Sequence, residues 1–314
     1  MAKIAVVGAA NVDIGGFSRE KIVAGDSNPG KVRLSLGGVG RNIAANAAKL
    51  GLTTELVTAL GTDAFARMIR QDCEEAGISL QHAAEIPGEN SSVYLFVADD
   101  DGDMTAAVND MALYEHMTPE RLEVVIPALN QQDLVVLDAN LPESTLTWLA
   151  ETLTVPLMAD AVSAAKVERL RWALCKLDAF KPNRIEAEKL TGIAVTDAQS
   201  AERAARTIAD MGVKQVYLSL GTRGVCCADS ERSVFMPGAV LPMKNATGAG
   251  DAFTAALAWA RTQEYTMELS ALAGMAAASI AVESAETVSP VLTEPFLVRR
   301  MHEIDEKTGG RRYE

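Results

Sequence analysis

Residues 133–139 read DLVVLDA, residues 156–160 read PLMAD, and residues 177–183 read LDAFKPN. Each run is mainly apolar and is followed by a stretch with the composition of a helix. Strands that alternate with helices in this way predict a mainly parallel sheet with right-handed crossover connections. Ligands of such sheets bind at the carboxyl ends of the strands, on the loops that follow them.

The alternation continues on both sides of this stretch. KIAVVGA (residues 3–9) is a nearly continuous apolar strand, of the kind that is covered on both faces of a sheet. Towards the C-terminus, QVYLSLG (residues 215–221) predicts another strand, and three helices begin near Ala249, Thr266 and Glu294. A chain of 314 residues is long enough for one large domain. We therefore expect a single α/β domain over residues 1–314.

Two stretches depart from the alternation. Residues 15–36 combine short apolar pairs with the turn-rich segment GDSNPGK, and residues 90–110 place two alternating runs on either side of DDDGD, which is a hairpin signal. We expect these stretches to form a small antiparallel layer outside the main sheet, which we call the lid. Lid strands with one open apolar face often pair between subunits, so we also expect a homodimer.

Composition and charge argue against several classes of protein. The net charge of −13 disfavours general nucleic-acid binding, because phosphate backbones require clustered Lys and Arg. No run reaches the roughly 20 apolar residues of a membrane span, so we expect no membrane association. Four cysteines without a C-x-x-C pair predict reduced thiols in a cytoplasmic protein. Three histidines without H-x-x-x-H spacing disfavour a zinc site.

The segment GAGD (residues 248–251) opens the apolar-faced helix AFTAALAWA. Its glycines allow the backbone to approach a ligand closely. The free N–H groups at a helix start favour a negative charge there. Two interpretations of Asp251 are open from the residues alone: it caps the helix, or it accepts a proton from a hydroxyl group beside an anion hole.

GGVGRN (residues 37–42) lies between a strand-like run and a helix, as the dinucleotide fingerprint G-x-G-x-x-G does. Gly38 and Gly40 fit that fingerprint, but Ile43 stands at the third glycine position, and the preceding run is not a fully apolar strand. An NAD(P)-dependent oxidoreductase is therefore disfavoured. The chain also lacks G-x-x-x-x-G-K-[ST], which excludes a P-loop enzyme.

Taken together, the two glycine segments resemble the signatures of the pfkB (ribokinase-like) carbohydrate and nucleoside kinases. Residues 37–61, GGVGRNIAANAAKLGLTTELVTALG, resemble the first signature, and NATGAGDAF (residues 245–253) resembles the second. NVD (residues 11–13), KPNRIEAE (181–188) and SLGTRG (219–224) resemble three further motifs, in family order. The resemblance spans most of the chain. It implies a ribokinase-like three-layer α/β/α fold with a mainly parallel central sheet and a small β lid.

Further segments are similar to those of one nucleoside-phosphorylating member of the family, namely DSNPGK (residues 26–31), IPGENSSVYL (86–95) and AVNDM (107–111). The resemblance therefore implies transfer of the γ-phosphate of ATP to the 5′-hydroxyl of a ribosyl group. Asp251 would take the hydroxyl proton; an unperturbed Asp is a weak base, but phosphoryl transfer depends mostly on positioning and charge. The backbone N–H groups of Gly248, Ala249 and Gly250 would hold the phosphoryl oxygens.

The resemblance also implies roles for other residues. Ribose hydroxyls would be bound by Asp13, Gly38 and Asn42, and we expect the base to contact Asn109 and Asp110. The ATP phosphates, and Mg²⁺ through water on Glu186, would be held by a third group: Lys166, Asn183, Glu186, Ser219, Gly221 and Gly224. Without the resemblance, these residues have ordinary structural interpretations. Asp13 would be a turn residue and Asn42 a helix cap. Asn183 and Glu186 would be a solvated helix start, and Lys166 a surface lysine.

One departure from the family pattern concerns monovalent cations. The second signature has Asn245 and Ala246 where Asp and Thr are usual. In K⁺-activated members, that Asp helps to arrange a cation site. A neutral amide in its place weakens the case for K⁺ dependence.

Alternatives to this interpretation come from three classes. Another sugar or nucleoside kinase of the same family would act on ribose, adenosine or a keto-sugar. A non-catalytic nucleoside-binding protein on the same scaffold would not need Asp251, which this chain retains. A dinucleotide oxidoreductase would bind NAD(P), which the missing third glycine disfavours.

Overall fold

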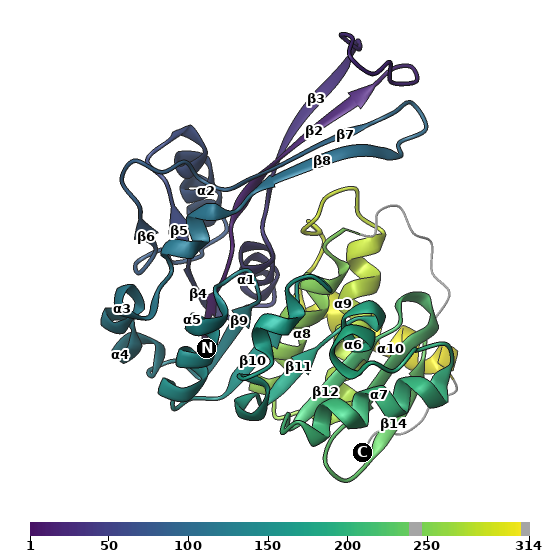
Figure 1. Cartoon of the computed structure of the whole chain (residues 1–314). Coiled ribbons are helices and arrows are strands. Elements are labelled where there is room, and N and C mark those ends of the chain that lie inside the picture. Colours follow the sequence, from purple (N-terminus) through teal and green to yellow (C-terminus); the bar gives the residue numbers. More distant parts are fainter. Residues whose placement is uncertain (239–246, 309–314) are drawn as a thin grey trace.

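The central sheet has eight strands and is mainly parallel (Figure 1). A computed structural model describes residues 1–238 and 247–308. The strand order is β14-β13-β12-β11-β10-β9-β1-β4, and only β13 and β14 run antiparallel to their neighbours. The strands are β1 Lys3–Val7, β4 Thr53–Val57, β9 Leu134–Asp138, β10 Leu157–Asp160, β11 Ala179–Lys181, β12 Gln215–Ser219, β13 Gly224–Ala228 and β14 Ser233–Pro237.

Helices cover both faces of this sheet, and the side chains of each strand alternate between the two cores. Ile4 and Val6 of β1 lie in one core, and Ala5 and Val7 lie in the other. The three-layer α/β/α arrangement predicted from the sequence is confirmed. The first core lies under α1 Val39–Lys49, α2 Ala64–Glu75, α8 Ala249–Thr262, α9 Met267–Val282 and α10 Glu294–Thr308, and the second under α3 Pro119–Leu122, α4 Ile126–Leu129, α5 Glu143–Thr152, α6 Arg184–Thr191 and α7 Ala198–Asp210.

Shorter elements connect these layers. Two strands of two residues, β5 Ala59–Leu60 and β6 Ala84–Glu85, pair in parallel. The helix expected near Ala165 is a 3-10 helix over Val167–Leu170. Further 3-10 helices span Ala112–His116, Glu123–Val125, Leu174–Lys176 and Gly221–Arg223. Within the described ranges, no helix has the length and apolar character needed to cross a bilayer.

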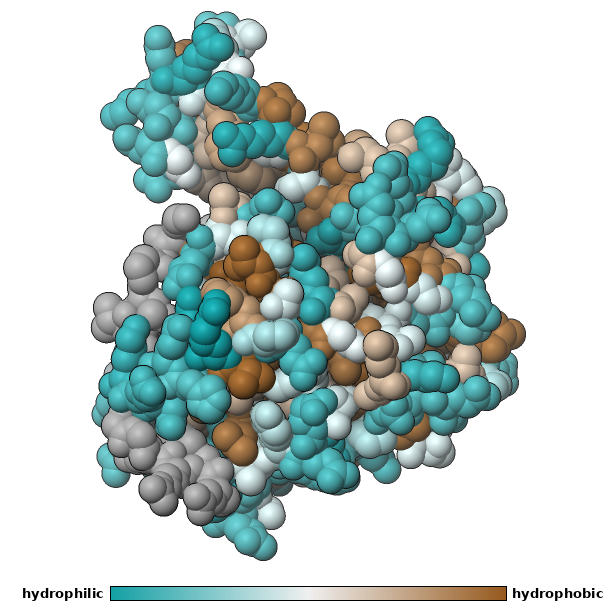
Figure 2. All heavy atoms as spheres, turned by 180° about the vertical axis from the view of Figure 1, so that it is seen from behind, coloured by the Kyte–Doolittle hydropathy of each residue, from teal (hydrophilic) through white to brown (hydrophobic). Residues whose placement is uncertain are grey.

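A separate four-stranded sheet, the lid, projects from the body (Figure 1). Its order is β3-β2-β7-β8, formed by β2 Asn11–Ser18, β3 Gly30–Gly37, β7 Val93–Ala98 and β8 Met104–Asp110. The expectation of an antiparallel layer is correct for two of the three pairings and wrong for the third, because β2 and β7 pair in parallel. From behind, hydrophobic side chains gather where the lid meets the body (Figure 2). Because β2 starts at Asn11, Asp13 stands on the lid itself.

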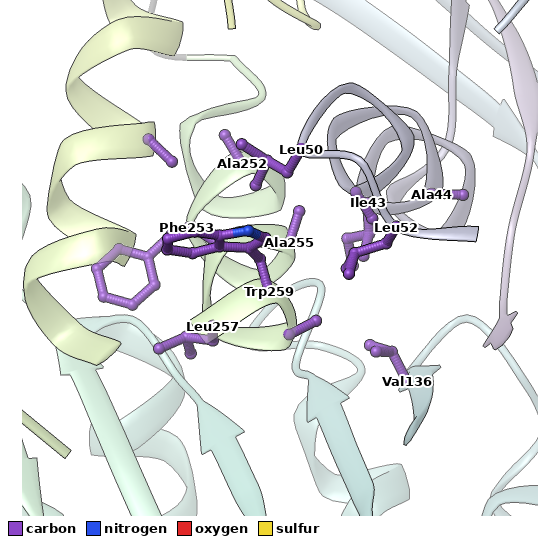
Figure 3. Packing of buried hydrophobic residues seen from close by; sticks show 14 of the residues in the cluster. Ile43, Ala44, Leu50, Leu52, Val136, Ala252, Phe253, Ala255, Leu257 and Trp259 are labelled. Carbon is purple, nitrogen blue, oxygen red and sulfur yellow. The ribbon is translucent and has the colours of Figure 1, made fainter. Parts of the chain in front are cut away.

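The packing of α1 against α8 joins distant parts of the chain (Figure 3). Ile43 and Leu50 of α1 and Phe253 and Trp259 of α8 are all almost fully buried in this core. Burial of such side chains stabilises the fold by roughly 1.5–3 kcal/mol each. The contact holds the starts of the two helices side by side, where the candidate site lies.

The start of α1 also approaches the end of β1 at van der Waals distance. A Cβ at Gly40 would lie 2.7 Å from the carbonyl carbon of Gly8, and Gly38 has a φ of 94°. A Cβ at Gly38 would lie 2.4 Å from the carbonyl oxygen of Ala9. Because any side chain would push the two segments apart, the glycines of GGVGRN are required for this close packing.

Candidate active site

Three strands of the central sheet end on charged residues at the same edge. Asp138 closes β9, Asp160 closes β10 and Lys181 closes β11. These strands are parallel neighbours, so their carboxyl ends meet. The start of α8 lies at this edge, because Thr254 donates a hydrogen bond of 2.6 Å to Asp160. The edge therefore brings three acidic side chains, counting Asp251, close to Lys181.

Asp251 lies in the first turn of α8 and is partly buried. Its Oδ2 accepts a hydrogen bond of 2.8 Å from Nδ2 of Asn42. Burial and the charge of Asp160 raise the pKa of Asp251 to about 7, although the Asn42 hydrogen bond and Lys181 act in the opposite direction. A carboxylate with this pKa is a better proton acceptor at neutral pH than an ordinary Asp.

Lys181 supplies the positive charge of the site. The side chain is buried, and its Nζ lies 3.3 Å from Oδ2 of Asp160. Burial alone would lower the pKa of Lys181, but Asp160, Glu186 and Asp251 together raise it. A Cβ at Gly250 would lie 3.4 Å from Nζ, so the ammonium group is next to the first turn of α8.

The first turn of α8 has the features of an anion site. Gly248 adopts a φ of 83°, and a Cβ there would lie 2.1 Å from the carbonyl oxygen of Thr287. No side chain caps the helix start, and its first intrahelical bond runs from the Ala252 N–H to the Gly248 carbonyl. Together with the helix dipole and Lys181, the N–H groups of Gly248, Ala249 and Gly250 can stabilise a negative charge beside Asp251.

Asp13 lies on the lid, in strand β2. Asn11 donates a hydrogen bond to its Oδ1, and burial raises the pKa of Asp13, with the Asn11 hydrogen bond and Arg41 opposing that rise. A Cβ at Gly37 would lie 2.4 Å from Oδ2 of Asp13, so the glycine makes room for the carboxylate. Gly38 follows, at the start of α1, which also carries Asn42. Of these three residues, Asn42 contacts Asp251, Gly38 precedes the same helix, and Asp13 lies on the lid strand β2.

The face of the lid that carries Asp13 is aromatic. Side chains of paired residues point to the same face, so the registers Asp13–Tyr94 and Gly15–Phe96 put both rings beside Asp13. The ring centroids of Phe17 and Phe96 lie 5.6 Å apart, edge to face. A Cβ at Gly15 would lie 2.6 Å from Phe96, so this glycine lets the rings lie over β2.

The two residues expected at the base lie on β8, the edge strand of the lid. Asn109 is in register with Tyr94, so it shares the face of Asp13. Asp110 is in register with Val93, and the alternation of the strand places it on the opposite face. Both side chains are exposed.

A pocket of about 700 Å³ lies between the lid and α1. Its walls combine lid residues with residues of α1, α2 and the loop after α9. Polar and charged groups line it together with the aromatic rings, including Asp13, Phe17, Arg33, Arg41, Asp72, Phe96 and Thr247.

A second pocket of about 320 Å³ lies on the other side of α8. Ser219, Gly221 and Gly224, expected at the ATP phosphates, line it together with Ala249 and Gly250. Its remaining walls are mainly apolar and were not predicted from the sequence. They include Val225, Phe253, Met275, Ala278, Val282 and Ile304.

Asn183 and Glu186 form a reciprocal cap at the start of α6. The Asn183 side chain accepts from the Glu186 N–H, and Glu186 accepts from the Asn183 N–H and Nδ2 at 2.7 and 2.6 Å. Glu186 is 3% exposed, and burial raises its pKa against the opposing charge of Lys181. Asn183 also forms a β-bridge with Ser219, which connects the cap to the wall of the second pocket.

Lys166 lies at the same sheet edge, nearer to β9. Its Nζ donates a hydrogen bond to Asn140, and burial lowers its pKa while Asp138 opposes that shift. The residues that line the second pocket do not include Lys166. Asn245 and Ala246, where the sequence departs from the family pattern, lie outside the described residues.

Several site residues were not predicted from the sequence: Arg41, Asp72, Asp138, Asp160, Lys181 and Thr254. Asp138, Asp160 and Lys181 could have been found from the sequence, because each is the charged last residue of an otherwise apolar strand in a parallel sheet. Among residues 1–238 and 247–308, no cluster of three or more His, Cys, Asp or Glu side chains is arranged to hold a metal by itself.

Comparisons with known proteins show the family and the fold of this chain. Residues 1–294 match the model of the pfkB family carbohydrate kinases. The chain is 36% identical over 257 residues to the pseudouridine kinase of Escherichia coli K12, covering 81% of this chain and 82% of that protein. A carbohydrate kinase from Agrobacterium tumefaciens matches at a TM-score of 0.84 and 28% identity, covering 97% of this chain and 98% of that one. Arabidopsis thaliana ribokinase, solved with ribose and ATP, matches at a TM-score of 0.84 and 25% identity, covering 96% and 99%.

Proposed function

This chain belongs to the pfkB family of carbohydrate kinases, and we propose that it transfers the γ-phosphate of ATP to the 5′-hydroxyl of pseudouridine. The family assignment makes it a phosphotransferase that acts on a hydroxyl group. The choice of substrate draws on its similarity to the pseudouridine kinase of E. coli. The segments DSNPGK, IPGENSSVYL and AVNDM, which resemble that kinase, fall on the connection between β2 and β3, on and before β7, and on β8.

The observation that carries the proposal is the aromatic face of the lid. A free sugar has no flat surface, whereas a nucleobase stacks on aromatic rings and on Arg guanidinium groups. Phe17, Tyr94 and Phe96 lie on the same lid face as Asp13, and the Arg33 guanidinium lies 5.3 Å from the centre of the Phe17 ring. A ribosyl group bound at Asp13 would therefore place an attached base against these rings.

Phosphoryl transfer follows from the groups around the start of α8. Asp251 accepts the proton of the 5′-hydroxyl as its oxygen attacks the γ-phosphorus, and the bond from phosphorus to the β-phosphate oxygen breaks. The pKa of about 7 leaves a large ionised fraction at neutral pH and makes Asp251 basic enough to assist. Lys181 and the N–H groups of Gly248, Ala249 and Gly250 stabilise the charge on the transferring group.

ATP is assigned to the second pocket. Its apolar walls, including Phe253, Met275 and Val282, suit the adenine ring. Ser219, Gly221 and Gly224 lie at the wall that leads to Ala249 and Gly250, where the phosphates would reach the anion site.

The cap formed by Asn183 and Glu186 suits Mg²⁺ that binds together with the nucleotide. Mg²⁺ keeps several waters and is held by one or two carboxylates together with substrate phosphates. Both oxygens of Glu186 already accept hydrogen bonds from Asn183, so water-mediated contact fits better than direct ligation. When bound, the ion would neutralise charge on the phosphate oxygens. The amide of Asn245 supports a reaction that needs no K⁺.

Recognition of the base is assigned to the lid edge. Pseudouridine has a C-linked uracil with two ring N–H donors, whereas uridine has one. The Asn109 side chain shares the face of Asp13 and carries an acceptor that can read the extra donor. Closure of the lid over the substrate would exclude water from the site. Asp110 would contact the base only if β8 also turns during this closure.

The outer face of the lid supports a homodimer. Val32, Leu34, Leu95 and Val108 lie on the face opposite Asp13 and are 72%, 54%, 41% and 66% exposed. A second copy of this sheet would cover such a face. The four cysteines are unpaired, as is usual in the cytoplasm, where we place the protein.

A substrate panel tests the proposal. The protein is incubated with ATP, MgCl₂ and, separately, pseudouridine, uridine, adenosine, ribose and fructose, and products are identified by mass and by phosphorus-to-C5′-proton coupling. We expect pseudouridine to have the highest kcat/KM and to be phosphorylated at the 5′-oxygen. Strong turnover of ribose or adenosine with none of pseudouridine would refute the substrate assignment. No phosphorylation of any acceptor would favour a non-catalytic binding protein.

A further inference from the structure

Arg41 is a buried charged residue next to Asn42 that the reaction described above leaves without a role. It is 8% exposed, and its backbone N–H donates to the carbonyl of Ala9. Its Nε and Nη2 atoms both donate to Oδ2 of Asp72 on α2, with the Nε bond at 2.9 Å. The guanidinium group is therefore held in one place by the helix opposite.

The third nitrogen of the same guanidinium reaches the amide of Asn42. Nη1 of Arg41 donates to Oδ1 of Asn42 at 3.1 Å, and Nδ2 of Asn42 donates to Oδ2 of Asp251 at 2.8 Å. A continuous chain of hydrogen bonds thus runs from α2 through α1 to the start of α8. It ends on the carboxylate assigned as the proton acceptor.

The direction of this chain follows from the chemistry of its members. A guanidinium group has donors only, whereas an amide has an acceptor oxygen and a donor NH₂ group. Arg41 therefore requires the oxygen of Asn42 to face it, and this turns the NH₂ group of Asn42 towards Asp251. Without Arg41, a half-turn of the amide would present its oxygen to Asp251, a contact that only a protonated carboxyl group satisfies.

We propose that Arg41, anchored on Asp72, is a positioning residue that fixes the amide of Asn42 in the orientation that donates to Asp251 and keeps this carboxylate ionised. The inference rests on the proposed role of Asp251 but not on the identity of the acceptor. It assigns the pair of Arg41 and Asp72 a function beyond joining α1 to α2.

Other charged groups around Asp251 also shift its pKa. Asp160 and Asp138, from β10 and β9, raise the pKa of Asp251, and Lys181 from β11 lowers it. The Asn42 hydrogen bond is the one contribution from α1. Arg41 itself also faces Asp13, whose pKa it lowers. Loss of Arg41 would therefore act on Asp251 through Asn42 and on Asp13 directly.

The test measures the pKa of Asp251 without any substrate. Protein labelled with ¹³C at Asp carboxyl groups is titrated by NMR as wild type, Arg41→Met and Asp72→Asn, with the Asp251 signal assigned from Asp251→Asn. We expect Arg41→Met to raise the pKa by about one unit or more, the size of one lost hydrogen bond to a charged group. Asp72→Asn removes the charged anchor but leaves the Arg41 guanidinium in place, so it should give a smaller rise in the pKa of Asp251.

A double-mutant cycle separates positioning from a purely structural role. In an Asn42→Leu background, Arg41→Met should produce no further rise, because Arg41 acts through Asn42. If Arg41→Met does not fold, Arg41→Lys takes its place and should give a partial rise, since lysine keeps the charge but has a single donor nitrogen.

Either of two results would overturn the proposal. In the first, Arg41→Met or Arg41→Lys lowers thermal stability while the Asp251 pKa stays within 0.2 units of wild type, about the resolution of the titration. In the second, Arg41→Met still raises the Asp251 pKa in the Asn42→Leu background. Failure of pseudouridine to react with the wild-type enzyme would refute the proposed substrate only. The pH at which kcat/KM falls on the acid side, measured with any accepted substrate, should shift together with the Asp251 pKa determined by NMR.

Discussion

Replacement of Phe96 by alanine tests whether the lid face binds a base. Phe96 lies on the same face as Asp13, half-buried, with its ring 5.6 Å from Phe17 and 5.9 Å from Tyr94. Stacking of a base on an aromatic ring contributes about 1–3 kcal/mol. Since 1.4 kcal/mol corresponds to a factor of ten, Phe96→Ala should raise KM for pseudouridine by about 5- to 150-fold.

The effect should be confined to the nucleoside. Stacking is present in both the ground state and the transition state, so kcat should change little. KM for ATP should stay at the wild-type value, because the pocket proposed for ATP lies on the other side of α8. The assay is steady-state kinetics with each substrate varied in turn, with thermal unfolding as a check on folding.

Val97→Ala is the matched control. Val97 follows Phe96 on β7 and, paired with Gly16 and Ala106, points to the opposite lid face. Loosening of the lid alone would raise KM in both variants, whereas loss of stacking raises it only in Phe96→Ala. A KM for pseudouridine within twofold of wild type in a folded Phe96→Ala variant would refute the assignment of the base to this face.

Three further predictions concern the start of α8. Because burial raises the pKa of Asp251 to about 7, kcat/KM should fall tenfold per pH unit below about pH 7 and level off above it; a profile flat down to pH 5.5 would contradict this. The folded-state pKa exceeds the ordinary value near 4, so this group's contribution to stability is full below pH 4 and lost as pH rises to 7. Asp251→Asn should therefore melt several degrees higher than wild type at pH 8, with the difference shrinking towards pH 4; a lower Tm at pH 8 would show that the carboxylate stabilises the fold. Thr254→Val, which removes the buried donor to Asp160, should cost about 1–3 kcal/mol in urea unfolding, and a change below 0.5 kcal/mol would argue against that hydrogen bond.

The layers of this fold were predictable because the sequence pattern is strong there. Apolar runs such as residues 134–138 have no polar interruption, which is typical of strands covered on both faces. The helices α2 and α9 start after Asp63 and Thr266, whose side chains cap them in the structure. The lid begins earlier than its turn-rich composition indicated, because β2 starts at Asn11 and pairs along its length with both β3 and β7. Pairing with a distant strand leaves no local signal.

Within the site, sequence motifs found the residues that sit on glycine-rich helix starts but not their partners. Asn42 and Asp251 are 209 residues apart, and only the packing of α1 on α8 brings them together. Arg41 was not singled out from the sequence, since its anchor Asp72 lies on another helix. Many walls of the pocket proposed for ATP are apolar side chains, such as Met275 and Ile304, that have no chemical signature in a sequence.

The most direct test of the account is phosphoryl transfer by Asp251→Asn under single-turnover conditions. Enzyme in excess over [γ-³²P]ATP, saturated with pseudouridine, is quenched over time, and the 5′-phosphate is counted. Asparagine keeps the shape but cannot accept the proton, so the rate of transfer should fall by about 10²- to 10⁴-fold while ATP binding is unchanged. A rate within a few-fold of wild type would show that Asp251 is not the base.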